Sequence, residues 1–179
     1  MSPSAIAEAL AALGPGAQSF EGRGGDGIRQ LLAVALGMVP PAPQSLLRVR
    51  YVGDPGEMPT LARHLLVAAS AWWGKPAYAG HMRELIALAV TTYAEPSLCP
   101  SCGGRGVAWT MEGTANTTKP CHQCHGRCHV EPDALTLAER MGADDAMWQH
   151  LHAKPYNGLR GTLRGWDAEG LRRVAEVLG

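Results

Sequence analysis

The sequence predicts a mainly α-helical fold with a helix-turn-helix and one small cysteine-rich insert, a zinc finger of two C-x2-C knuckles with room for a small β-hairpin. In several segments bounded by glycine and proline, apolar residues recur at the spacing of a helix. The apolar content is mostly alanine and leucine, with a single phenylalanine, and this composition favours helices. All five cysteines fall between residues 99 and 128, which sets that stretch apart from the helical segments.

The 179 residues are enough for one domain with a real core, and 46% of them are hydrophobic. We expect three parts in chain order. These are an N-terminal helical region at 1–76, a helix-turn-helix domain at 77–166 that carries the insert 99–129, and a C-terminal helix at 167–179.

Helical periodicity predicts four helices before the cysteines. They cover residues 2–13, 27–38, 58–73 and 77–94. A glycine-rich loop at 14–27 separates the first two, and the prolines at 40, 41 and 43 end the second helix. Residues 46–52 alternate as a strand would, but a lone strand has no partner, so we favour a helix there.

A second group of helices follows the cysteines. Pro132 suits a first helical turn, residues 133–141 form a short helix, and Gly142 breaks it. The next helix begins near Asp144 and ends near residue 153. Pro155 then starts another helix, and Asp167 caps the last one.

The two helices around Gly142 have the register of a helix-turn-helix. Ala138 is the small residue where the helices touch, Gly142 takes the turn, and Trp148 packs back on the first helix. Such a turn fixes a crossing angle that lets the second helix enter a DNA major groove. Leu137, Met141 and Leu151 are expected to fill the apolar positions around the pair. The exposed positions of the second helix are predicted to be Asp144, Asp145, Gln149, His150 and Lys154.

Some of these exposed residues favour DNA binding, and others argue against it. Gln149 is suited to reading adenine and Lys154 to contacting phosphate. Asp144 and Asp145 would repel phosphate, unless one of them caps the helix. Many helical pairs joined by glycine bind no DNA, and the formal net charge of zero adds no support for nucleic-acid binding.

The cysteine spacing indicates a zinc site. Cys99 and Cys102 form one C-x2-C pair, Cys121 and Cys124 form a second, and eighteen residues separate the pairs. Zn2+ takes four soft or borderline ligands in a tetrahedron, and a tight turn aims both sulfurs of a pair at one metal. The polar loop between the pairs cannot bury a core of its own, so metal binding would supply much of its folding energy.

Disulfide bonds and a different set of metal ligands are the alternatives to four-cysteine coordination. Disulfides are disfavoured because five cysteines leave one over and no secretion signal is present. Cys128 or one of the nearby histidines, which are His122, His125 and His129, is an alternative ligand or a neighbour of the site.

The sequence shows no enzyme or membrane signature. It lacks H-E-x-x-H, a Walker loop and the H-x-E deaminase pair, and four protein ligands leave no open metal position, so no catalysis is expected. The N-terminus lacks the basic start and apolar run of a secretory signal, and no stretch approaches the length of a membrane span. A cytoplasmic location without membrane contact is therefore expected.

The order of these motifs resembles the late-gene antitermination protein Q family of lambdoid phages. The shared order is a long apolar helix ending in Tyr93, then CPSCGGRG, a polar loop, CHQCHGRC, a proline-started helix, and Trp148 followed by Lys154-Pro155-Tyr156. The resemblance covers about residues 80–165. Cys128 stands where the family pattern prefers glycine.

The resemblance implies a sequence-specific DNA-binding protein that works in the cytoplasm of a bacterial host. Its partners would be double-stranded DNA near a phage late promoter and the bacterial RNA polymerase holoenzyme, which then reads through pauses and terminators. Carried over, the four paired cysteines are the zinc ligands and residues 133–154 read the DNA. The expected DNA contacts are Arg105, Lys119, Arg127, Gln149, His150, Lys154 and Arg160.

Two other functions fit the same motifs. CPSCGGRG is also a C-x-x-C-x-G-x-G repeat of the kind found in DnaJ-like chaperones, although only two such pairs occur and no His-Pro-Asp tripeptide is present. A zinc-stabilised transcription regulator that does not act on polymerase would use the same DNA-binding chemistry.

Overall fold

The structure is a computed structural model, and it describes residues 5–6, 25–72, 79–94, 97–103, 105–112, 115–126 and 129–178. This part of the chain is mainly helical, as predicted. The helices before the cysteines are α2 (Gly25–Gly37), α3 (Pro41–Leu47), the π-helix η1 (Arg48–Val52), the short 3-10 helix η2 (Pro55–Glu57), α4 (Met58–Trp72) and α5 (Ala79–Ala94). The helices after them are α6 (Ala134–Arg140), α7 (Asp145–Met147), the π-helix η4 (Trp148–His152) and α8 (Ala153–Leu178).

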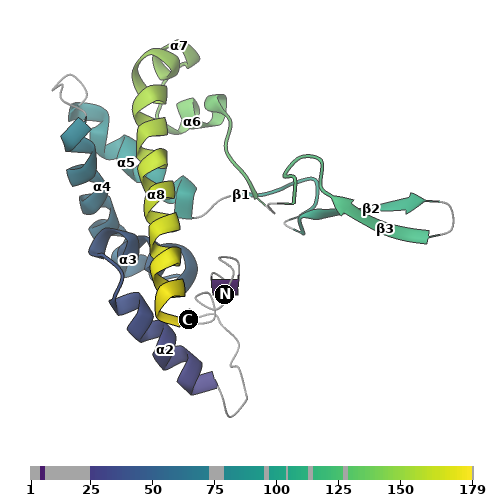
Figure 1. Ribbon diagram of the computed structural model, residues 1–179. Coiled ribbons are helices and arrows are strands. Elements are labelled where there is room, and N and C mark those ends of the chain that lie inside the picture. The colour runs from purple at the N-terminus through teal and green to yellow at the C-terminus, as the bar shows by residue number, and fades with distance from the viewer. Residues whose placement is uncertain are drawn as a thin grey trace.

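The long helix α8 organises the helical part of the molecule. It is continuous over 26 residues and packs against α2, α3, α4 and α5 (Figure 1). The predictions that Pro155 starts a new helix and that Asp167 caps the last one are therefore wrong. The π-helical turn η4 ends at His152, so Leu151, whose carbonyl the ring of Pro155 would meet in a regular α-helix, lies in backbone that is not regular α-helix. Asp167 lies in mid-helix, where its carboxylate binds other side chains.

Two apolar clusters lie along α8. The larger cluster joins α3, α4, α5, α6, η4 and α8, and its fully buried members include Leu46, Leu61, Leu65, Leu85, Leu159 and Leu163. The smaller cluster joins α2 to the end of α8 through Leu32, Ala35, Leu36, Val39, Leu47 and Val174, with Ile6 added from the N-terminal region. A single helix thus contributes to both cores.

The N-terminal helices largely follow the predicted boundaries. Residues 46–52 are helical, as favoured, in the end of α3 and in η1. The prolines do more than end a helix, because Pro40 is the N-cap of α3 and Pro41 is its first residue, where a missing amide costs nothing. The helix α2 begins at Gly25, two residues before the predicted start at 27, so residues 25–26 are helical although a loop was predicted there. Most of the predicted helix 2–13 lies outside the described residues.

A tight turn joins α6 to α7. Asp133, not Pro132, begins α6 as its N-cap, and its carboxylate accepts the Thr136 amide at 2.8 Å. Gly142 holds φ +64°, in the left-handed region that favours glycine. Asp144 caps α7 by accepting the Met147 amide at 2.7 Å. The helix after the turn does not end near residue 153, because α7 continues through η4 into α8.

The side chains around this turn agree with the sequence in part. Trp148 is only 2% exposed and lies in the same cluster as Leu137 and Ala138, as expected. Met141 packs against that cluster. Leu151 is 42% exposed, so its predicted place in the core is wrong.

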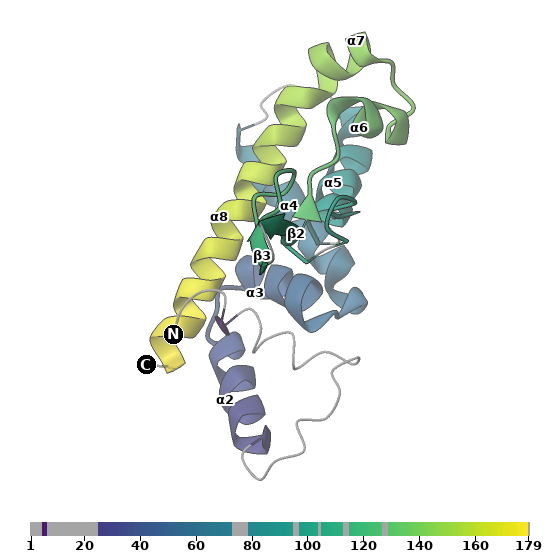
Figure 2. The ribbon, with the colours of Figure 1, turned by 90° about the vertical axis from the view of Figure 1, so that its right-hand side faces the viewer.

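The cysteine-rich stretch forms an arm that projects from the helices (Figures 1 and 2). At its base, β1 (Ser97–Leu98) pairs antiparallel with β4 (His129–Val130). Beyond the cysteines, β2 (Val107–Glu112) pairs antiparallel with β3 (Ala115–Pro120), which confirms the expected small hairpin. Among the described helices, none combines the length and the apolar character needed to cross a bilayer.

Candidate metal centre and nucleic-acid contacts

The structure brings the four predicted ligand sulfurs together. The Sγ atoms of Cys99, Cys102, Cys121 and Cys124 all lie within 4.8 Å of one another. The Cys99–Cys121 and Cys102–Cys124 distances are both 3.8 Å, and all four residues are free thiols, which excludes disulfides among them. Each side chain is at most 1% exposed. One metal ion could therefore contact four buried sulfurs that come from both C-x2-C pairs.

Short backbone contacts shape the two cysteine loops. In the first loop, the Gly106 amide donates to the Cys102 sulfur at 3.3 Å, and Gly106 has φ +74°, which glycine adopts readily. In the second loop, the His125 amide donates to the Cys121 carbonyl at 2.7 Å. The Cys121 amide donates to the Gly106 carbonyl at 2.9 Å and joins the two loops.

The protein environment acts on the thiols in opposite directions. Burial raises the pKa of the Cys99 thiol to about 11. Backbone amides of Cys124 and Gln123 donate to the Cys121 sulfur and lower the pKa of that thiol. A divalent cation among the sulfurs would favour the thiolate at every position, because its charge offsets the cost of burying the anions.

The alternative ligands do not join the sulfur group. His122, His125 and His129 are all exposed, and the group of possible ligand atoms found among the described residues contains the four cysteines alone. Cys128 lies outside the described residues, so its role as a ligand stays a hypothesis.

The side chains predicted to contact DNA from the helix after Gly142 are exposed to solvent. Gln149, His150 and Lys154 are exposed, as are Asp144 and Asp145. Asp144 is engaged as the helix cap, and the Gln149 amide is 3.5 Å from the Asp145 carboxylate. Lys154 is in the first turn of α8, so the exposed polar face runs from α7 through η4 into α8.

The other predicted DNA contacts lie elsewhere. Arg105 and Lys119 are exposed on the arm, and Arg105 Nε donates to the Cys102 carbonyl at 2.9 Å. Figures 1 and 2 both show α7 at one end of the molecule and the β2–β3 hairpin well away from it, so the structure does not bring these two groups onto one face. Arg127 lies outside the described residues.

Arg160 has a structural role that the sequence did not reveal. Its side chain is 12% exposed, and Nη2 lies 2.5 Å from a Glu131 carboxylate oxygen. Arg164 binds the same carboxylate at 2.8 Å. The hydrogen bond from Arg160, with the charges of both arginines, lowers the pKa of Glu131 to about 2. Since Glu131 directly follows β4, this ion pair fixes the exit of the arm to α8.

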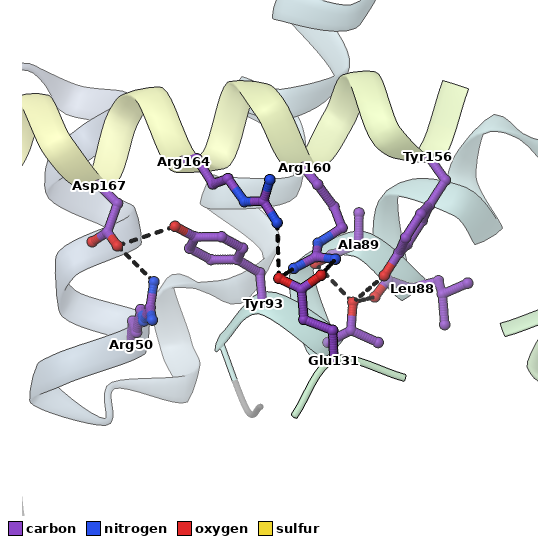
Figure 3. A network of polar contacts seen from close by, with 10 residues as sticks. Arg50, Leu88, Ala89, Tyr93, Glu131, Tyr156, Arg160, Arg164 and Asp167 are labelled. Atoms are coloured by element: carbon purple, nitrogen blue, oxygen red, sulfur yellow. Dashed lines mark hydrogen bonds and ion pairs between the residues drawn. The ribbon is translucent and has the colours of Figure 1, made fainter. Parts of the chain in front are cut away.

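A second network, which is partly buried and was also missed from the sequence, joins η1 and α5 to α8 (Figure 3). One Asp167 carboxylate oxygen accepts from Arg50 at 2.6 Å, from the Tyr93 hydroxyl at 3.1 Å and from the Tyr51 hydroxyl at 3.3 Å. The Arg50 guanidinium also stacks 4.5 Å from the centre of the Tyr93 ring. Burial, with the Asp167 charge, raises the pKa of Tyr93 to about 12.

Comparison with known proteins adds no relative, because no protein-family model and no curated protein sequence matches this chain. The assignment of a function therefore depends on the geometry of the two candidate sites and on the order of the sequence motifs.

Proposed function

We propose that the protein is a zinc-stabilised, DNA-binding transcription regulator that acts as an antitermination factor on bacterial RNA polymerase. The observation that carries the DNA-binding part is the helix pair α6–α7. The second helix of this pair continues from α7 through η4 into α8, and a tight turn at Gly142 and the buried Trp148 hold it in place. Gln149 and His150 of η4 and Lys154 of α8 remain exposed on it.

The metal proposed for the arm is zinc. A tetrahedron of sulfurs at about 2.3 Å from zinc has edges of about 3.8 Å. This length agrees with the 3.8 Å that separates Cys99 from Cys121 and Cys102 from Cys124. Four protein ligands close the coordination sphere, which suits a structural ion and leaves no position for a catalytic water. The ion would supply folding energy to an arm whose described residues form only a small buried cluster around the four cysteines.

The helix-turn-helix interpretation rests on the α6–α7 geometry. The turn takes residues 141–144, and a glycine with positive φ lets the chain reverse within it. Asp144 has a structural role as the cap of α7, which explains an acid at this position without a contact to DNA. We therefore propose Gln149 and His150 as base contacts and Lys154 as a phosphate contact. We leave Arg160 out of this set because it is mostly buried against Glu131.

The antitermination part rests on the resemblance of residues 80–165 to the phage Q proteins. The helix α7 continues through η4 into the 26-residue helix α8, and this continuity supports a role in which DNA binding positions the rest of the molecule. A zinc-stabilised regulator without polymerase binding is the second candidate, since it needs the same helix pair.

The DNA-binding claim is tested by selecting duplexes from a random pool with the zinc-loaded protein and measuring their affinity against salt. We expect Gln149→Ala to reduce discrimination between sequences by about 1–3 kcal/mol, because a bidentate base contact is lost. Lys154→Ala should weaken all duplexes alike and reduce the salt slope by about one phosphate contact. Arg173→Ala, which removes an exposed charge from the far end of α8, is the control and should change neither. Identical slopes for Lys154→Ala and Arg173→Ala would contradict the phosphate contact.

Antitermination is tested by transcription with purified polymerase holoenzyme on templates that carry an intrinsic terminator. The proposal expects read-through on templates bearing the selected DNA site and none on templates that lack it. DNA binding without any read-through would favour the second candidate. Read-through from every promoter alike would contradict the requirement for a DNA site.

A further inference from the structure

A cavity of about 620 Å³ lies where the base of the arm meets α5 and α8. It is distinct from the four sulfurs and from the exposed face of α7. The arm contributes Gln123 and Glu131 to its lining, the helices contribute Arg160 and Arg164, and η1 contributes Arg50. Residues far apart in the sequence therefore meet around one space.

The lining of this cavity carries an excess of positive charge. Three arginines face one carboxylate, Glu131, which gives a formal charge of +2 (three minus one). Asp167, which is not part of the lining, forms an ion pair with Arg50 and offsets the charge of that arginine. Among the described residues, one positive charge of the cavity therefore remains without a matching negative charge. Within a partly enclosed space, such an excess attracts anions more strongly than it would at an open surface.

Glu131 uses only part of the hydrogen-bonding capacity of Arg160 and Arg164. Each guanidinium has five N–H donors in a fixed plane. The Arg160 Nη atoms and Arg164 Nη2 bind the Glu131 carboxylate, whereas Arg160 Nε is buried without a hydrogen-bond partner among the described residues. Figure 3 shows both guanidinium groups extending from α8 toward Glu131, with Tyr93 beside them. The carboxylate thus holds two arginines side by side. Arg160 Nε is enclosed and does not reach the cavity, so the donors left for a ligand are mainly those of Arg164, whose side chain is 58% exposed and binds Glu131 through Nη2.

We propose that this cavity binds a phosphate group between Arg160 and Arg164, with Arg50 adding charge from the other side of Tyr93. The planar guanidinium fork matches phosphate oxygens, and a tetrahedral phosphate can engage two guanidinium groups at different oxygens, which a single planar carboxylate does less well. The phosphate comes either from a DNA backbone or from a free phosphate compound. This inference does not depend on recognition of a DNA sequence by α7.

The test is a calorimetric titration of the full-length, zinc-loaded protein with inorganic phosphate at constant ionic strength. Arg164→Gln is the informative variant because Arg164 is 58% exposed and can be changed without opening the core. We expect saturable binding that Arg164→Gln weakens by about tenfold, the loss of one charge-assisted hydrogen-bonding group. The control Arg173→Gln removes a similarly exposed arginine, 48% exposed on the same helix, and should bind phosphate as the unmodified protein does.

A second titration in the presence of duplex DNA separates the two sources. Competition between phosphate and duplex, with weaker DNA binding by Arg164→Gln, identifies the DNA backbone as the ligand. Phosphate binding that is unchanged by duplex identifies a free phosphate compound. Either result supports the site, and it can be read even if the proposed helix-turn-helix binds no DNA. Absence of saturable phosphate binding, or equal weakening in Arg164→Gln and Arg173→Gln, would overturn the proposal.

Discussion

At the scale of single residues, His152 is the buried group with the clearest energetic consequence. It is 1% exposed, and neither ring nitrogen has a hydrogen-bond partner among the described residues. Its ring lies 5.2 Å from that of His81 and 6.0 Å from that of Trp148. Burial, together with the nearby His81, lowers the pKa of His152 below its usual 6.5.

This arrangement predicts an acid-sensitive fold. Since the folded state binds the proton less readily than the unfolded state, stability is retained above pH 6.5 and lost as the pH falls below it. His152→Phe keeps a ring in place and removes two unpaired polar atoms. It should raise the free energy of unfolding at pH 7 by about 1 kcal/mol and flatten the fall below pH 6.5. Urea unfolding across this pH range measures both effects.

The matched control is His150→Phe, since His150 is exposed two residues earlier on the same helix. It should leave the pH dependence of stability unchanged. If His152→Phe and the unmodified protein lose stability in parallel on acidification, His152 is not the group responsible.

The sequence predicted the positions and roles of single side chains well where residues close together in the chain determine them. The clustering of the four cysteines was predicted because a C-x2-C pair specifies its own geometry. The sequence allowed either Asp144 or Asp145 to be a helix cap, and Asp144 is the one that caps α7. Arg160 was proposed as a DNA contact, yet it binds Glu131, 29 residues earlier in the chain. No local pattern marks a pair at that separation.

At the scale of elements, two glycines in α8 differ in what surrounds them. A Cβ atom built at Gly165, an exposed position, meets nothing within 4 Å. At Gly170 it would lie 2.9 Å from the buried Leu47 side chain of α3. Gly170 is therefore the close contact between α3 and α8, whereas Gly165 only weakens the helix.

Alanine at these two positions should have opposite effects. Gly165→Ala should stabilise the protein by about 0.5–1 kcal/mol, because alanine restricts the unfolded chain and favours the helix. Gly170→Ala should destabilise it by about 1–3 kcal/mol through overpacking against Leu47. Thermal unfolding of the two variants gives the comparison. The same sign for both changes would show that the α3–α8 contact differs from the one described.

The boundaries of elements were predictable where proline and glycine act as they do in isolated peptides. The start and end of α4 and α5 lie close to the predicted positions, and Gly142 breaks the chain as expected. The continuous α8 was not predictable, because Pro155 follows a π-helical turn and Asp167 is held by Arg50, which is 117 residues away. Structure outside the local sequence pattern, and not that pattern itself, therefore keeps α8 continuous at Pro155 and at Asp167.

At the scale of the whole molecule, α8 connects two apolar cores, and the arm is fixed to it by few contacts. The β1–β4 pair and the Glu131 ion pairs form the junction among the described residues, while the four cysteines form a separate small cluster that only Val130 extends. We therefore expect this arm to depend on a bound metal ion for folding, whereas the helices have apolar cores of their own.

Removal of the metal should therefore unfold the arm while the helical part of the molecule stays folded. Chelation, or Cys99→Ser, is expected to unfold residues 99–129 and leave most helical circular dichroism intact, because the two helical cores contain none of the four cysteines. Amide hydrogen exchange measured segment by segment would locate the loss. Uniform loss of protection over the helices as well would show that the arm and the helical cores fold as one unit.

The most direct test of the account is X-ray absorption at the zinc edge of the purified full-length protein, combined with metal analysis. The account predicts one zinc ion per chain with four sulfur ligands at about 2.3 Å, and loss of that ion in Cys99→Ser. A protein that keeps its full zinc content after this substitution, or a spectrum dominated by nitrogen or oxygen ligands, would contradict it.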